Sequence, residues 1–302
     1  MSTPYYSPQI PVFQRPKENM FFFHIPKTAG TSVNAFFKKR YARNFLVRTP
    51  FSEVKPYWPN TGIYKGGHLD WDAFSTYPIE TKSFTFLRDP FKLIESTYYF
   101  VKNSPHNTED MTEASKRTRK YNFKDWLKFV QDGGIQNEAN IDTEKHLEPN
   151  SLDNLYARCF LGRLVTSQYT RLPFDKYDAE MKTIQKRLET FSAVGIVEDF
   201  DNSLISICRA CNVIPPAKDE LVIKNQASAT QKEQRDKVDD ETLELLHSIT
   251  VLDRDIYQFG KQLFLQQAID SGLDLDGSFR EQLGAIRKER RANRIKEKQI
   301  SA

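Results

Sequence analysis

The sequence predicts an α/β fold in which a central parallel sheet is flanked by helices. Two observations carry this prediction. Short apolar, β-prone runs end abruptly in turn residues, and segments with helical spacing follow them. Strands that alternate with helices form parallel sheets, whose ligands bind beyond the carboxyl ends of the strands. The chain has 302 residues, which is enough to bury the core of one enzyme-sized domain.

The first predicted strand, at residues 21–25, leads into a loop suited to an anion. Beyond Pro26, a helix is expected over residues 32–41. The N-terminus of a helix offers unpaired N–H groups and a partial positive charge to an anion. We therefore expect a phosphate or sulfate group to bind here; the alternative is an ordinary strand-to-helix turn. The loop residues are Lys27, which adds a full charge, Ala29, Gly30, and the hydroxyl donors Thr28, Thr31 and Ser32, the last of which is the N-cap in the alternative.

The order of residues in this loop separates it from a nucleoside-triphosphate P-loop. The Walker pattern G-x-x-x-x-G-K-[ST] places glycines before its lysine. Here Lys27 precedes Gly30, which is the only glycine of the loop. We expect a three-layer, P-loop-like fold that carries a different anion loop.

The next predicted strand, at residues 62–65, leads to Gly66-Gly67-His68-Leu69-Asp70-Trp71. A histidine titrates near neutral pH, since its unperturbed pKa is about 6.5, and glycines let a ligand approach the backbone. His68 is therefore a candidate proton acceptor. The alternative is a histidine in a surface turn that is hydrogen-bonded to Asp70.

A third strand is predicted at residues 83–87 and ends at Arg88-Asp89-Pro90. Proline is well placed in the first turn of a helix, which we expect to continue through residue 100. Arg88 ends the strand and Ser96 lies about two turns into the helix, so the two could hold a second phosphate. The alternative is that Arg88 pairs with Asp89 or with a neighbouring acid.

Together, Pro26–Ser32 and Arg88-Asp89-Pro90, with Ser96 and Tyr98-Tyr99, resemble the motifs of sulfotransferases that use 3′-phosphoadenosine 5′-phosphosulfate (PAPS). The loop is most similar to that of the carbohydrate branch, which includes the heparan sulfate 2-O- and 6-O-sulfotransferases. The resemblance spans roughly residues 20–265. Further similar segments are 154–162, 194–200 and 252–257.

The resemblance implies a sulfuryl transfer from PAPS to a hydroxyl of a carbohydrate or other acceptor. Residues 27–32 would bind the 5′-phosphosulfate, and Arg88 and Ser96 the 3′-phosphate. His68 would be the catalytic base, oriented by Asp70, and Lys27 would stabilise the leaving bisphosphate.

Two other functions compete with this interpretation. One is a nucleotide kinase or other P-loop-type phosphotransferase; the other is a non-catalytic protein that binds anions or sugars on the same fold. No metal is expected. Cys208 and Cys211 have the spacing of a metal pair, but Cys159 is the only other cysteine, so core thiols are the favoured interpretation.

The remaining segments are predicted as scaffold. A mobile loop is expected over residues 102–120 and helices over 123–131 and 151–161. Helical spacing of core residues is expected at Met181, Ile184, Leu188 and Phe191. A buried strand is expected at 191–197 and a helix from about Asp201. One long amphipathic helix is expected from the spacing of Leu245, Ile249, Leu252, Ile256, Phe259 and Leu263.

Three regions are expected along the chain: a polar N-terminal extension at 1–19, a sulfotransferase domain at 20–270, and a basic helical tail at 271–302. Eight basic and three acidic residues lie between 280 and 298. A solvated tail is the favoured reading, and no nucleic-acid partner is expected. There is no apolar run of 18 residues, no signal-peptide pattern and no disulfide framework, so we expect a soluble cytoplasmic enzyme without a membrane span.

Overall fold

The structure is a computed structural model. It describes residues 18–41, 46–49, 63–67, 71–75, 81–103, 113–132, 152–162, 176–216 and 237–273.

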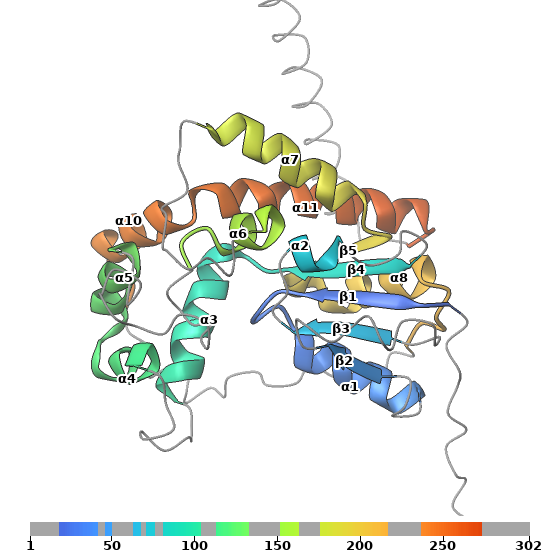
Figure 1. The fold of residues 1–302 in the computed structure, drawn as a ribbon, viewed down its shortest axis with the longest axis horizontal. Helices are drawn as coiled ribbons and strands as arrows, with labels where there is room; N and C mark the ends of the chain where they lie inside the picture. Colours follow the sequence, from blue (N-terminus) through green and yellow to red (C-terminus); the bar gives the residue numbers. More distant parts are fainter. Residues whose placement is uncertain are drawn as a thin grey trace, which may run out of the picture.

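Five parallel strands form the central sheet in the order β2-β3-β1-β4-β5 (Figure 1). This confirms the predicted α/β fold with its parallel sheet. Met20 pairs in register with Ile63 on one side and Lys82 on the other, so the strands end at a common edge. The strands are β1 (Met20–His24), β2 (Leu46–Thr49), β3 (Ile63–Gly67), β4 (Lys82–Leu87) and β5 (Ala193–Ile196).

Successive side chains of strands β1 and β4 point to opposite faces of the sheet and belong to two separate hydrophobic cores. In β1, Phe21 and Phe23 belong to the core on one face, and Phe22 belongs to the core on the other. In β4, Phe84 and Phe86 join Phe22 in the second core, where the rings of Phe22 and Phe84 stack at 5.0 Å. Alternation with apolar residues on both faces is the pattern of a sheet that is covered on both sides.

Helices cover the two faces and form the outer layers (Figure 1). Helices α1 and α8 pack on the Phe22 face, while α6, α7 and α11 pack on the Phe21 face. Helices α3, α4, α5 and α10 group at the left in Figure 1, where β4 leads into α3. The helices are α1 (Gly30–Arg40), α2 (Trp71–Phe74), α3 (Pro90–Lys102), α4 (Glu113–Lys120), α5 (Phe123–Gln131), α6 (Leu155–Leu161), α7 (Tyr177–Glu189), η8 (Val197–Asp199), α8 (Phe200–Ala210), α10 (Asp240–Ile249) and α11 (Val251–Asp270).

The prediction of one long helix over residues 245–263 is wrong. The structure has two helices there, α10 and α11, which are separated at Thr250. Asn154 causes the break from outside the helix. Its backbone N–H donates to the carbonyl of Ile249 (2.6 Å), and its side-chain oxygen accepts from the N–H of Leu252 (2.8 Å). Residues 249–252 contain neither glycine nor proline, so the apolar spacing gives no sign of this interruption.

The prediction of a mobile loop over residues 102–120 is also wrong in part, because residues 113–120 form helix α4. Thr118 is fully buried, and its hydroxyl accepts the indole N–H of Trp126 on α5 (3.0 Å). Lys102, at the end of α3, donates to the carbonyls of Arg119 and Tyr121. These tertiary contacts stabilise a helix whose sequence is almost entirely polar.

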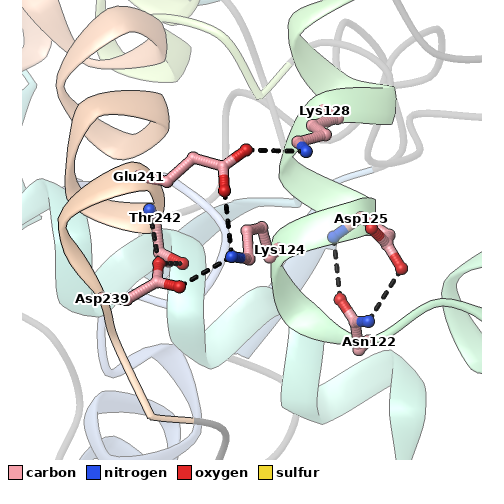
Figure 2. A network of polar contacts seen from close by, with 7 residues as sticks. All are labelled: Asn122, Lys124, Asp125, Lys128, Asp239, Glu241 and Thr242. Carbon is pink, nitrogen blue, oxygen red and sulfur yellow. Dashed lines mark hydrogen bonds and ion pairs between the residues drawn. The ribbon is translucent and has the colours of Figure 1, made fainter.

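Helices α5 and α10 begin side by side, and charged residues connect their first turns (Figure 2). Asn122 caps α5, and Asp239 caps α10 by accepting the N–H of Thr242 (2.8 Å). Lys124 contacts both Asp239 (2.6 Å) and Glu241 (3.0 Å). The hydrogen bond from Lys124 keeps the pKa of Asp239 well below its usual range. Because these groups face water, the network adds orientation more than stability.

The polar extension and the basic tail lie almost wholly outside the described residues, so the three-region division stays a prediction. Within the described ranges, no helix is both long and apolar enough to cross a membrane.

Gly260 allows helix α11 to lie directly on the sheet. A methyl group at this position would come within 2.2 Å of the Cδ1 atom of Leu87, which is fully buried in β4 and cannot swing into water. We expect Gly260→Ala to lower the free energy of unfolding in urea by about 1–3 kcal/mol, despite the better helix propensity of alanine.

The double variant Gly260→Ala/Leu87→Val is the control, because it removes the atom that is struck. It should lose less stability than the sum of the two single variants. An additive result would contradict the proposed collision.

Candidate active site

The loop between β1 and α1 has a backbone form that is uncommon for its residues. Lys27 and Ala29 both have φ near 62°, in the left-handed region that favours glycine. Left-handed residues within a turn direct successive N–H groups toward one side, which makes a concave site for an anion. The helix begins immediately afterwards at Gly30, with Ala29 at its N-cap and no side-chain cap. The alternative of Ser32 as the N-cap is therefore wrong.

The hydroxyl residues of this loop have different surroundings. Thr28 is fully buried, and its hydroxyl donates to the carbonyl of Ile25 (2.7 Å), so it shapes the loop from inside. Ser32 is also buried, in the first turn of α1, while Thr31 is exposed. The side chain of Thr31 is thus open to solvent at the start of α1, while the N–H of Ser32 already donates to the carbonyl of Ala29 (2.9 Å).

The imidazole of His24 leaves no space for a side chain at Gly30. A Cβ atom on Gly30 would lie 2.0 Å from Nε2 of His24, which is nearly buried at the end of β1 and packs on the ring of Phe22. The imidazole thus supports the first turn of α1 from below. This contact explains why the motif at residues 26–32 needs a glycine at position 30.

Arg88 lies beside Lys27. An Nη1 N–H of Arg88 donates to the carbonyl of Lys27 (3.3 Å), although the two residues are 61 positions apart. Burial, with the charge of Arg88 as the second cause, lowers the pKa of Lys27 to about 8. Neither cation has a carboxylate within ion-pair distance among the described residues.

The guanidinium of Arg88 is also incompletely hydrogen-bonded. Its Nε is buried and has no partner in the part of the chain that the structure describes. Two adjacent cations and a buried, unsatisfied N–H group are costly to maintain in an empty site, and an anion would relieve both. The residues present therefore fit a phosphate-bearing ligand.

Helix α3 brings Ser96 to the same region. Asp89 caps this helix by accepting the N–H of Lys92 (3.0 Å), and Pro90 occupies its first turn as expected. Ser96 lies one turn before Phe100 on the same face of the helix. The ring of Phe100 lies under the ammonium group of Lys27, with the nitrogen 3.6 Å from the ring centre.

His68 and Asp70 lie outside the described residues, so their roles stay predictions. Strand β3 ends at Gly67, which pairs in register with His24 of β1. The chain therefore leaves the sheet for His68 at the same edge as the Lys27 loop. Trp71, just beyond, is held by the guanidinium of Arg187, which lies 4.9 Å from its ring.

Sequence reasoning missed the residues that surround the Arg88-Asp89 peptide. The hydroxyl of Tyr156 lies 2.7 Å from both the N–H and the carbonyl of Arg88. Glu198 accepts the N–H of Asp89 (3.1 Å) and the hydroxyl of Tyr257 (3.0 Å). All three side chains come from the segments 154–162, 194–200 and 252–257, which the resemblance had marked without assigning a role.

The cysteine pair is part of the core, as favoured above. Cys208 and Cys211 are buried, free thiols on and just after α8, and burial raises the pKa of both. Within the described ranges, no three His, Cys, Asp or Glu side chains gather as metal ligands would.

Comparison with known proteins places the chain in a family. The sequence profile of the sulfotransferase family matches residues 11–260. A comparison with curated proteins finds no match.

The chain therefore belongs to the sulfotransferase family, and it is an enzyme of sulfuryl transfer. Membership implies PAPS as the sulfuryl donor.

The lowered pKa of Lys27 predicts a pH dependence of donor-site binding. An anion favours the protonated lysine, so its affinity falls once pH exceeds the pKa of the empty site. We expect the association constant of 3′-phosphoadenosine 5′-phosphate, measured by calorimetry, to fall about tenfold between pH 7 and pH 9.

Lys27→Arg is the matched control, because arginine stays charged throughout this range. Its affinity should be nearly independent of pH. A wild-type profile as flat as that of the arginine variant would mean that Lys27 is not the group that titrates.

Proposed function

We propose that the protein transfers the sulfuryl group of PAPS to a hydroxyl group of a carbohydrate, the acceptor class of the branch that its motifs resemble. The observation that carries the donor part is the pairing of Lys27 with Arg88 at the ends of two neighbouring strands. The acceptor part rests on the likeness of the motif at residues 26–32 to the carbohydrate branch.

The donor has two anionic ends, and the site offers a separate group of donors for each. The N–H groups at the start of α1, with Lys27 and Thr31, bind the 5′-phosphosulfate. Arg88 and Ser96 bind the 3′-phosphate, for which the fork of a guanidinium is well suited. The unsatisfied Nε of Arg88 supports this assignment.

PAPS supplies a sulfuryl group attached to a bisphosphate leaving group. Lys27 stabilises the negative charge that develops on that leaving group as the bond breaks. With a pKa of about 8, Lys27 is mostly protonated at neutral pH, and a bound anion would favour that charged form further. Because a sulfuryl group carries less charge than a phosphoryl group, we expect Lys27 and the loop N–H groups to act without a metal ion.

His68 accepts the proton of the sugar hydroxyl, which is a poor nucleophile until that proton leaves. Asp70 orients the imidazole and stabilises its charged form. The register of Gly67 with His24 supports this placement, because it directs the chain toward the edge that carries Lys27.

Binding of 3′-phosphoadenosine 5′-phosphate, with 5′-AMP as comparison, tests the donor site. We expect micromolar affinity for the bisphosphate and at least tenfold weaker binding of AMP, which lacks the 3′-phosphate. Arg88→Ala should remove this difference in affinity, because it removes the charge that binds the 3′-phosphate.

Equal affinity for the two nucleotides in the wild type would overturn the donor assignment. A preference for ATP with Mg²⁺ in a thermal-shift assay, with no response to the bisphosphate, would favour a phosphotransferase instead. Binding without turnover on any acceptor would favour an anion-binding protein.

Turnover tests the two chemical roles. With desulfated heparan sulfate as acceptor and EDTA present, we expect Lys27→Ala and His68→Ala each to lower kcat by at least about a hundredfold. Circular dichroism should show that both variants remain folded. Full activity of His68→Ala would refute its role as the base, and activity that EDTA abolishes would refute the metal-free mechanism.

A further inference from the structure

The turn that carries Arg88 is held by side chains from distant parts of the chain. Arg88 and Asp89 follow the last residue of β4, so their backbone groups lie beyond the sheet ladder. The N–H of Arg88 donates to the hydroxyl of Tyr156, and that hydroxyl donates to the carbonyl of Arg88 (2.7 Å each). On the next residue, the N–H of Asp89 donates to Glu198 (3.1 Å).

Tyr156 is a rigid support for this turn. Its side chain is fully buried, and burial raises the pKa of its phenol well above the usual value, so the hydroxyl keeps the proton that it donates. The N–H groups of Tyr156 and Ala157 both donate to the buried carboxyl group of Asp253 on α11 (3.1 Å each). These bonds fasten the first turn of α6, and with it the ring of Tyr156, to the longest helix of the fold.

Glu198 is supported by the same helix. It lies just beyond β5, and its second oxygen accepts the hydroxyl of Tyr257 on α11 (3.0 Å). Burial raises the pKa of Tyr257, so this hydroxyl also remains a donor at neutral pH. Helix α11 thus braces the Arg88-Asp89 peptide through two independent side chains.

The side chain of Arg88, in contrast, has one hydrogen bond to the described protein, the contact with the carbonyl of Lys27 (3.3 Å). No carboxylate among the described residues orients its guanidinium. Its direction is therefore set mainly by the backbone from which it starts. A small rotation of that peptide would move the guanidinium by a larger distance, since it lies at the end of a long side chain.

We propose that Tyr156 and Glu198 are positioning residues for the donor: they fix the Arg88-Asp89 peptide so that Arg88 discriminates nucleotides that carry a 3′-phosphate. This inference rests on the proposed function, in which Arg88 binds that phosphate. Neither residue needs to touch the nucleotide. Both act through the peptide of Arg88.

The test uses Tyr156→Phe, which keeps the ring and removes only the hydroxyl. The measured quantity is the ratio of the dissociation constant of 5′-AMP to that of 3′-phosphoadenosine 5′-phosphate, obtained by calorimetry on the full chain. We expect Tyr156→Phe to lower this ratio about tenfold. The dissociation constant of AMP itself should change less than twofold, since AMP depends on the loop at residues 26–32.

Thr118→Val is the matched control. It also removes a buried hydroxyl that makes a hydrogen bond, here with the indole of Trp126 on α5 and not with the Arg88-Asp89 peptide. It should lower thermal stability and leave the ratio unchanged. A fall in the ratio with Thr118→Val equal to that with Tyr156→Phe would reduce the effect to a general loss of stability and overturn the proposal.

A second variant, Glu198→Ala, tests the other side of the peptide and protects the proposal against misfolding of Tyr156→Phe. Glu198 is exposed, so the fold should tolerate its loss. The ratio should again fall several-fold. Unchanged ratios in both variants would overturn the inference while leaving the donor assignment intact.

A double-variant cycle with Arg88→Ala separates positioning from other effects. If Tyr156 acts through Arg88, Tyr156→Phe should not change the ratio further once Arg88 is alanine. If Tyr156→Phe still lowered the ratio in the Arg88→Ala variant, the proposal that Tyr156 acts through Arg88 would be contradicted. A wild-type ratio near one would instead refute the proposed function itself, so the two failures are distinguishable.

Discussion

The parallel pairing of β1 with β4 is the constraint on which the candidate site depends. It ends both strands at one edge, so the loop of Lys27 and the turn of Arg88 become neighbours across 61 positions of sequence. Burial of Lys27 and, second to it, the charge of Arg88 lower the pKa of this lysine, so it costs free energy to hold the two cations together. The sheet can bear this cost because Phe22 and Phe23 anchor β1 in cores on both faces.

Helix α11 orients two further segments at this edge of the sheet. Its Asp253 holds the start of α6, and its Tyr257 holds Glu198, so two loops at the sheet edge share one rigid support. Asp253 is fully buried, and burial raises the pKa of its carboxyl group to about 7. Two accepted N–H bonds, from Tyr156 and Ala157, offset part of the cost of burying this acid.

The sequence predicted what depends on local pattern, and it failed where distant contacts decide. The apolar run before Pro26, the proline after Arg88-Asp89 and the spacing over residues 123–131 each gave the correct element. The break at Thr250 did not show, because it is made by Asn154 from another part of the chain. The role of the Tyr156 hydroxyl was not predicted either, since no local rule pairs a tyrosine with a peptide 68 positions away.

The left-handed backbone at Ala29 has a consequence for protein engineering. An alanine in this form costs about 1–2 kcal/mol, so Ala29→Gly looks like a simple stabilising change. Glycine, however, has more freedom in the unfolded chain, which removes about 0.5–1 kcal/mol of that gain. A net gain of about 0.5–1 kcal/mol in favour of glycine remains. Alanine therefore keeps the anion loop stiffer at a small net cost in stability, and a glycine at position 29 would exchange that stiffness for heat stability.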